Sequence, residues 1–253
     1  MNFAPWAALP VGILIATVVS AIGLGGGIFW MPFLIIVAGL EPGRAVATSL
    51  LIQSAGMGSS SLAYARRDCV KPGPTLIFLL VALPGLTVGA FFTQLLDPAL
   101  TKLILGLLVM ATALWFVAAG QTYGSEPSGR GDTAGAWRNS WVIAVMSVAS
   151  GMLSISMGEW LVPVLRNKLD LKMSAAIGTS IAIIFGTCVA GTAAHYLLGG
   201  RADLALVFWA VPGVIIGGQI GPKIATKIDD RLLKEIFIFL LTLIGIHLIY
   251  NAY

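Results

Sequence analysis

The sequence predicts an all-α polytopic membrane protein built from two inverted repeats, each a re-entrant or broken helical hairpin followed by three transmembrane helices. Three observations predict this fold. The 253 residues are 58% hydrophobic and only 10% charged, whereas soluble domains carry roughly 25% charged residues. Two long apolar segments are interrupted by small residues, and a polar linker divides the chain near its midpoint. Lipid is therefore the expected solvent for much of the surface.

The first apolar segment, 5–40, is interrupted by Gly23-Leu-Gly-Gly-Gly27. Glycine costs about 1 kcal/mol relative to alanine inside a helix, so this stretch should break the helix. Broken backbone within a membrane is tolerated only where protein or a water-filled cavity covers it. We therefore expect a hairpin here. Three apolar runs of about the 20 residues that a span needs follow it, at 45–65, 74–96 and 99–119.

The second half repeats this order after a Gly/Ser-rich linker at 120–138. Its hairpin, 139–165, is interrupted by Ser150-Gly-Met-Leu-Ser-Ile-Ser-Met-Gly158. Three further helices are expected at 173–198, 204–222 and 232–250. The first repeat then covers residues 1–119 and the second covers 139–253.

The two halves align with each other. Gly27 and Gly158 lie 131 positions apart, and the same offset pairs Ala-Val-Ala-Thr-Ser-Leu (45–50) with Ala-Ile-Gly-Thr-Ser-Ile (176–181). Further along, Pro84-Gly85 and Gly89 match Pro212-Gly213 and Gly217 at an offset of 128. Matches in constant order indicate an internal duplication.

The loop charges predict how each hairpin meets the membrane. If 139–165 crosses once, the two sides carry 6 and 9 Lys or Arg residues; if it returns to its starting side, they carry 12 and 3. The sharper split fits the excess of positive charge in cytoplasmic loops. A re-entrant hairpin plus three spans is an odd number of crossings, so the halves are inverted. Both termini should face outside, and the linker 120–138 should be cytoplasmic.

The interrupted motifs resemble a known family. Gly-x-Gly-Gly-Gly-x-x-x-x-Pro-x-Leu at 23–34, followed by Ala-Thr-Ser at 47–49, is similar to the TauE/SafE sulfite exporter family, also called the toluene-sulfonate uptake permease family. The second copy, 150–165 followed by Gly178-Thr-Ser180, resembles it too. The resemblance implies movement of sulfite, organosulfonates such as sulfoacetate, or related sulfur anions across the bacterial inner membrane. Substrate and direction vary within the family.

A small oxyanion needs several hydrogen-bond donors in a dry site, without enough fixed charge to trap it. The glycine loop could supply bare backbone N–H groups, and hydroxyl and amide side chains could complete the wall. The alternative for all of these residues is that small side chains permit close helix packing. The candidate substrate-binding residues are Gly25, Gly26, Gly27, Thr48, Ser49, Gln53, Ser154, Ser156, Thr179 and Ser180.

Four further residues are candidates for coupling or gating. Glu159 is an acid inside an apolar segment, so it could carry a coupled proton or complement a helix dipole. Trp30 and Trp160 lie one residue apart in repeat register and could act as hydrophobic gates or as core. His195 could be a pH-sensitive gate or an interfacial polar residue. Arg44 could attract anions or snorkel to the surface.

Other functional classes lack their motifs. The sequence has no His-Glu-x-x-His, nucleophile elbow or Walker motif, and no metal-ligand spacing or basic-aromatic strip. It therefore predicts no enzyme, no cofactor, no metal and no nucleic-acid partner. We expect a secondary transporter that works by alternating access at a midplane site between the hairpins, in exchange or symport with protons or without them. A passive anion channel, or a transporter of another small organic anion, remains an alternative.

Overall fold

The computed structural model is all-helical over the part of the chain that it describes, and that part contains no strand. The described residues are 4–97, 133–154 and 157–225, with 99–101, 103–104, 106–107, 110–111, 114, 242, 246 and 250. The predicted helices 99–119 and 232–250, and most of the linker 120–138, therefore lie largely outside the described residues.

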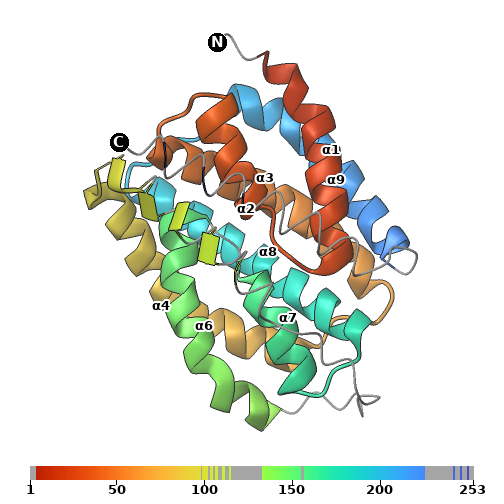
Figure 1. The fold of residues 1–253 in the computed structure, drawn as a ribbon. Helices are drawn as coiled ribbons and strands as arrows, with labels where there is room; N and C mark the ends of the chain where they lie inside the picture. Colours follow the sequence, from red (N-terminus) through yellow and green to blue (C-terminus); the bar gives the residue numbers. More distant parts are fainter. Residues whose placement is uncertain are drawn as a thin grey trace.

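The first apolar segment is a broken helix. After a 3₁₀ turn (Pro5–Ala7), α1 (Ala8–Ile22) ends at Gly23, whose φ of +78° is a left-handed conformation that glycine adopts without strain. The next helix, α2 (Gly27–Pro32), continues into a π-helical turn, η2 (Phe33–Val37). The change follows Pro32, which lacks the N–H group that an α-helix would use. Figure 1 shows the chain turning back after α1.

Two long helices follow the first hairpin. They are α3 (Pro42–Ala65) and α4 (Pro72–Leu95), close to the predicted 45–65 and 74–96. Each begins with proline at its first position, where the missing N–H group costs nothing because a helix has no internal acceptor there.

The second half has the same order of elements. The helix α6 (Thr133–Leu153) breaks at Ser154, and α7 (Gly158–Asn167) follows. The start of α6 lies before the predicted 139, inside the predicted linker. Thr133-Ala-Gly-Ala-Trp-Arg138 contains no proline, so its polar and small residues can still form helix. The last two described helices, α8 (Met173–Leu197) and α9 (Leu204–Ile224), agree closely with the predicted 173–198 and 204–222.

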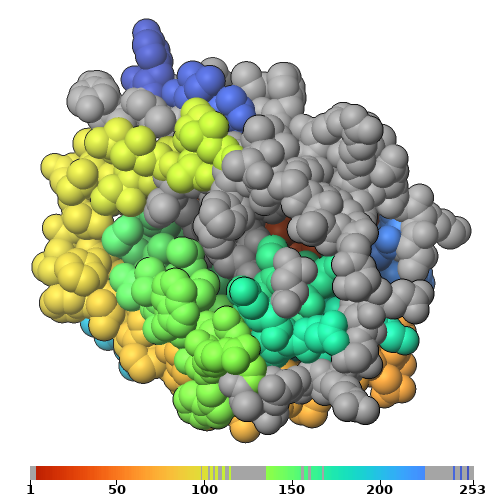
Figure 2. Space-filling view, turned by 60° about the horizontal axis from the view of Figure 1, so that its bottom comes forward, coloured from red at the N-terminus to blue at the C-terminus, as the bar shows by residue number. Residues whose placement is uncertain are grey.

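The two arms of each hairpin pack on different partners. Helix α1 packs on α9 and α6 packs on α4, whereas α2 contacts α3 and α7 contacts α8 (Figure 1). Figure 2 shows α6 and α7 on one face of the molecule, with α4 beside α6. Glycines allow the close approach: a Cβ atom added to Gly217 of α9 would lie 2.5 Å from the Ile13 carbonyl oxygen.

Four described segments are long and apolar enough to cross a membrane: Pro5–Ile22, Pro72–Leu95, Met173–Leu197 and Leu204–Ile224. Helix α3 is as long as α4 but more polar. Its polar side chains Thr48, Ser49, Gln53 and Ser60 are at most 2% exposed, so they face protein rather than the surroundings. The chain is a membrane protein, and α3 and α8 each bury four polar side chains among the described residues.

Candidate functional site

The tips of the two hairpins lie against each other. Gly27, at the start of α2, abuts the Ser154 carbonyl group so closely that an added Cβ atom would overlap it. Likewise, Gly158 at the start of α7 faces the first hairpin, since an added Cβ atom would lie 2.7 Å from the Gly23 carbonyl oxygen. At these positions glycine permits backbone to pack directly on backbone. The packing role predicted as one alternative for Gly27 is therefore present in the structure.

A cluster of three polar side chains lies beside this crossing. The Gln53 side-chain Nε2 donates to Ser49 Oγ at 3.0 Å and to Ser154 Oγ at 2.8 Å, and Ser154 Oγ donates to Ser49 Oγ at 3.1 Å. Their exposed fractions are 0% for Ser49, 2% for Gln53 and 1% for Ser154. The structure thus brings together three predicted site residues from α3 and from the break after α6. We call them the Ser49–Gln53–Ser154 cluster.

This cluster has unused hydrogen-bonding capacity. Within the described part of the chain, Gln53 Oε1 is buried and has no hydrogen-bond partner. Such a buried amide oxygen is costly to leave unmatched, because it has given up water without gaining a donor. All three side chains are uncharged, so a small oxyanion that took over the Gln53 and Ser154 donors would not be trapped by charge.

Ser180 lies near the cluster but makes a different bond. Its Oγ donates to the Gly23 carbonyl oxygen at 3.0 Å and it is fully buried. Gly26 is adjacent to the cluster, since an added Cβ atom would lie 3.4 Å from Gln53 Cγ. Gly25 is buried in the same break between α1 and α2.

Thr48 and Thr179 do not join the cluster. Thr48 Oγ1 donates to the Arg44 carbonyl oxygen at 2.7 Å and accepts from the Asp203 backbone N–H at 2.8 Å. Thr179 Oγ1 accepts from the Lys71 backbone N–H at 3.0 Å. Both threonine hydroxyls thus bond away from the cluster, and their place in the binding wall stays a prediction. A step of one residue along a helix turns the side chain by about 100°, which points Thr48 away from Ser49.

The predicted coupling and gating residues lie in different surroundings. Trp30 is 1% exposed and packs edge-on against Phe33, with ring centroids 5.6 Å apart. His195, in the last turn of α8, is fully buried, and its Nε2 donates to the Gly151 carbonyl oxygen at 2.7 Å. Glu159 and Trp160 belong to α7, but their side chains lie outside the described residues, as does all of Ser156.

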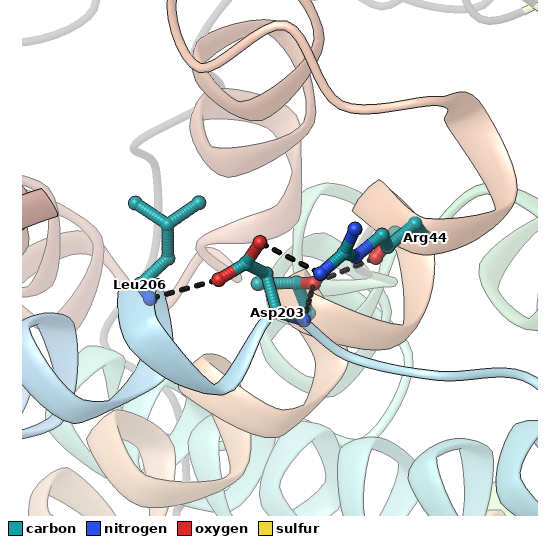
Figure 3. Close-up of polar contacts among 4 residues, drawn as sticks. Arg44, Asp203 and Leu206 are labelled. Carbon is teal, nitrogen blue, oxygen red and sulfur yellow. Dashed lines mark hydrogen bonds and ion pairs between the residues drawn. The ribbon is translucent and has the colours of Figure 1, made fainter. Parts of the chain in front are cut away.

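Asp203 is a further polar residue that was not predicted from the sequence. Its Oδ1 accepts from the Leu206 backbone N–H at 3.1 Å, and its Oδ2 lies 2.9 Å from Arg44 Nη2 (Figure 3). An acidic residue directly before an apolar helical run is a signal for a helix N-cap, so this capping role was detectable. The pairing with Arg44 was not, because the two residues are far apart in sequence.

Comparisons with known proteins agree with the membrane fold. The model of the family described as "Sulfite exporter TauE/SafE" matches residues 8–248. The chain is 28% identical to "Probable membrane transporter protein YunE" of Bacillus subtilis (strain 168), over 95% of this chain and 96% of that protein. It is 26% identical to a "Probable membrane transporter protein" of Xylella fastidiosa (strain 9a5c), over 96% and 94% of the two chains.

A third relative, "Probable membrane transporter protein YfcA" of Escherichia coli (strain K12), is 21% identical over 95% of this chain and 88% of its own length. No solved structure matches the chain. The family match extends over both hairpins and across the midpoint linker. The chain belongs to the TauE/SafE sulfite exporter family.

Proposed function

We propose that this protein is a secondary transporter for small sulfur-containing oxyanions, such as sulfite, sulfonates or sulfoacetate. The anion would bind between the two broken hairpins and become accessible to each side of the membrane in turn. The observation that carries the proposal is the buried, uncharged Ser49–Gln53–Ser154 cluster at the hairpin crossing. Polar groups at helix breaks within a membrane are typical of transporter binding sites.

The proposal includes two inverted repeats, and the backbone conformation supports them. Six described residues have positive φ, and they form three pairs that are each 131 positions apart. Every described residue with a positive φ in one half thus has a counterpart in the other, whether or not glycine occupies the position. The pairs are Gly23 with Ser154, Gly39 with Asp170, and Asp68 with Gly199.

Hydrogen bonds within each half support the same repeat. The Tyr64 hydroxyl donates to the Ser20 carbonyl oxygen at 2.9 Å, and His195, 131 positions later, donates to the carbonyl oxygen of Gly151. The two acceptors are also 131 positions apart. Equivalent hydrogen bonds inside both halves are expected of an internal duplication.

The glycine contacts correct one part of the predicted alignment. Gly85 approaches the Ala144 carbonyl oxygen, and Gly217 approaches that of Ile13, which is the equivalent acceptor. The offset for α4 and α9 is therefore 132 rather than the 128 expected from the Pro-Gly pairs. The difference of four residues is about one helical turn, so the wrong alignment still placed glycines on the correct face.

Other functions are less well supported. A passive channel for the same anions, or a transporter of another small organic anion, would use the same buried cluster, but broken helices in inverted halves favour alternating access. An intramembrane enzyme would need a nucleophile with its base, or a metal. In the described segments, no group of three His, Cys, Asp or Glu residues is placed to hold a metal ion.

Flux into proteoliposomes tests the proposal. The purified protein should carry at least one of sulfite, thiosulfate and sulfonates in preference to acetate. Gln53→Leu should lower that flux about tenfold to a hundredfold, since it removes both donors of a buried amide. Gln94→Leu is a matched control, because Gln94 is an exposed residue of α4. Absence of flux for every sulfur anion would overturn the substrate class, and full activity of Gln53→Leu would overturn the site.

A further inference from the structure

An ion pair joins the first half of the chain to the second where α3 and α9 begin (Figure 3). Arg44, in the first turn of α3, lies 2.9 Å from the Asp203 carboxylate. Asp203 also donates its backbone N–H to Thr48 and caps α9 through Leu206. Both carboxylate oxygens and the amide of Asp203 are therefore engaged, and Asp203 holds the start of α9 against the start of α3.

A second contact of the same type lies beyond the other end of α3. There the Lys71 backbone N–H donates to Thr179 Oγ1 at 3.0 Å. Thr48 and Thr179 are 131 positions apart, and Lys71 and Asp203 are 132 apart, as the corrected repeat requires. From Thr48 to the end of α3 is about 25 Å at 1.5 Å per residue. The two equivalent hydrogen bonds thus hold the two halves of the chain together at opposite ends of α3.

The residues beside the Thr48 contact and those beside the Thr179 contact differ in charge. The position equivalent to Arg44 is Ala175, and Lys71 itself stands where the other half has Asp203. The ion pair therefore reinforces the Thr48 contact, whereas Ala175 has no charge with which to form such a pair beside the Thr179 contact. The Arg44 side chain is 54% exposed and that of Asp203 is 19% exposed, so the pair is partly screened and its effect should be modest.

We infer that Arg44 and Asp203 are gating residues that latch one side of the transport path. This inference rests on the proposed function, because alternating access requires each end to open in turn. Opening at the Arg44 end separates α3 from α9 and breaks the ion pair as well as the hydrogen bond. The pair therefore shifts the conformational equilibrium toward states closed at this end. In the predicted topology this end faces outside.

Thiol labelling in proteoliposomes tests the latch. A Ser49→Cys reporter is built in a background without Cys69 and Cys188, and a membrane-impermeant maleimide is added to one side at a time. Asp203→Asn keeps a side-chain oxygen that can cap α9 but removes the charge, and Arg44→Gln removes the partner. Each should speed labelling from the outer side about two- to fivefold, the range expected for a partly exposed pair. The double variant should add little to either single variant.

Thr179→Val is the matched variant at the other end. It removes the acceptor for the Lys71 N–H and should speed labelling from the cytoplasmic side instead. Unchanged labelling in both Arg44→Gln and Asp203→Asn, or additive effects in the double variant, would overturn the latch. Faster labelling from the cytoplasmic side would support the latch and overturn the orientation. The assay needs no substrate, so it stays informative even if sulfur anions are not carried.

Discussion

At the scale of single residues, Gly27 determines how closely the hairpin tips can approach. Its Cα packs against the Ser154 carbonyl group, and an added methyl group would overlap that group. Backbone cannot move aside as a flexible side chain can. A substitution here must therefore separate the two tips and disturb the adjacent Ser49–Gln53–Ser154 cluster.

We expect Gly27→Ala to lower stability by about 1–3 kcal/mol, as overpacking at a buried contact commonly does. Gly43→Ala is the control, because nothing lies within 4 Å of a Cβ atom at Gly43 and its φ is not positive. Alanine there should be neutral or slightly stabilising, since it favours helix. Thermal unfolding in detergent measures both variants. Equal midpoints would show that the tips can separate without cost.

The candidate site was predictable where helix geometry determined it. Ser49 and Gln53 are four residues apart on one helix, so the sequence places them on the same face, and the structure joins them by a hydrogen bond. Ser154 was predicted from its place in the opposite break, and it contacts both. Arg44 and Asp203 meet only through packing of distant helices, which no local spacing reveals.

At the scale of elements, α1 and α6 are each followed by a residue in the left-handed conformation, and the two residues differ in type. Gly23 and Ser154 both have positive φ, at 78° and 56°. A non-glycine residue there costs of order 1 kcal/mol. The serine hydroxyl, which accepts from Gln53 and donates to Ser49, is the observed compensation.

Two substitutions of Ser154 separate its conformation from its hydroxyl group. Ser154→Ala loses the hydroxyl and keeps the unfavourable conformation, whereas Ser154→Gly loses the hydroxyl and relieves that conformation. We expect the glycine variant to be more stable than the alanine variant by about 1 kcal/mol in thermal unfolding. Both should transport less than the parent chain. A more stable alanine variant would show that the backbone strain at this position is unimportant.

The sequence predicted where both helices break but not how each arm continues. Four glycines in five positions made the first break evident, and small residues marked the second. The π-helical turn after Pro32 and the early start of α6 at Thr133 were not predicted. Proline can be accommodated in several ways within a packed helix, and polar composition alone does not decide between a loop and a helix end.

At the scale of the whole molecule, equivalent hydrogen bonds in the two proposed repeats indicate where these repeats differ in length. The offset is 131 up to Gly200, whose N–H bonds the His195 carbonyl oxygen just as that of Cys69 bonds Tyr64. It is 132 from Asp203 onward, as the Thr48 and Thr179 bonds show. One extra residue therefore lies between Gly200 and Asp203. Matching Pro84-Gly85 with Pro212-Gly213 by sequence gave an offset of 128. This offset is too small by four residues, which is about one helical turn.

Membrane orientation is the remaining prediction at this scale. If each half contributes a re-entrant hairpin and three spans, both ends of the chain share the outer side, and the linker is cytoplasmic. Cysteines introduced at Asn2 and Ala252 of a cysteine-free protein should react with an impermeant maleimide in intact cells. Ser128→Cys, within the linker, should react only after permeabilisation. If the cysteine at position 2 also required permeabilisation, the first half would make an even number of crossings. The halves would then be parallel, and closing contacts at opposite ends of α3 could not be related by inversion.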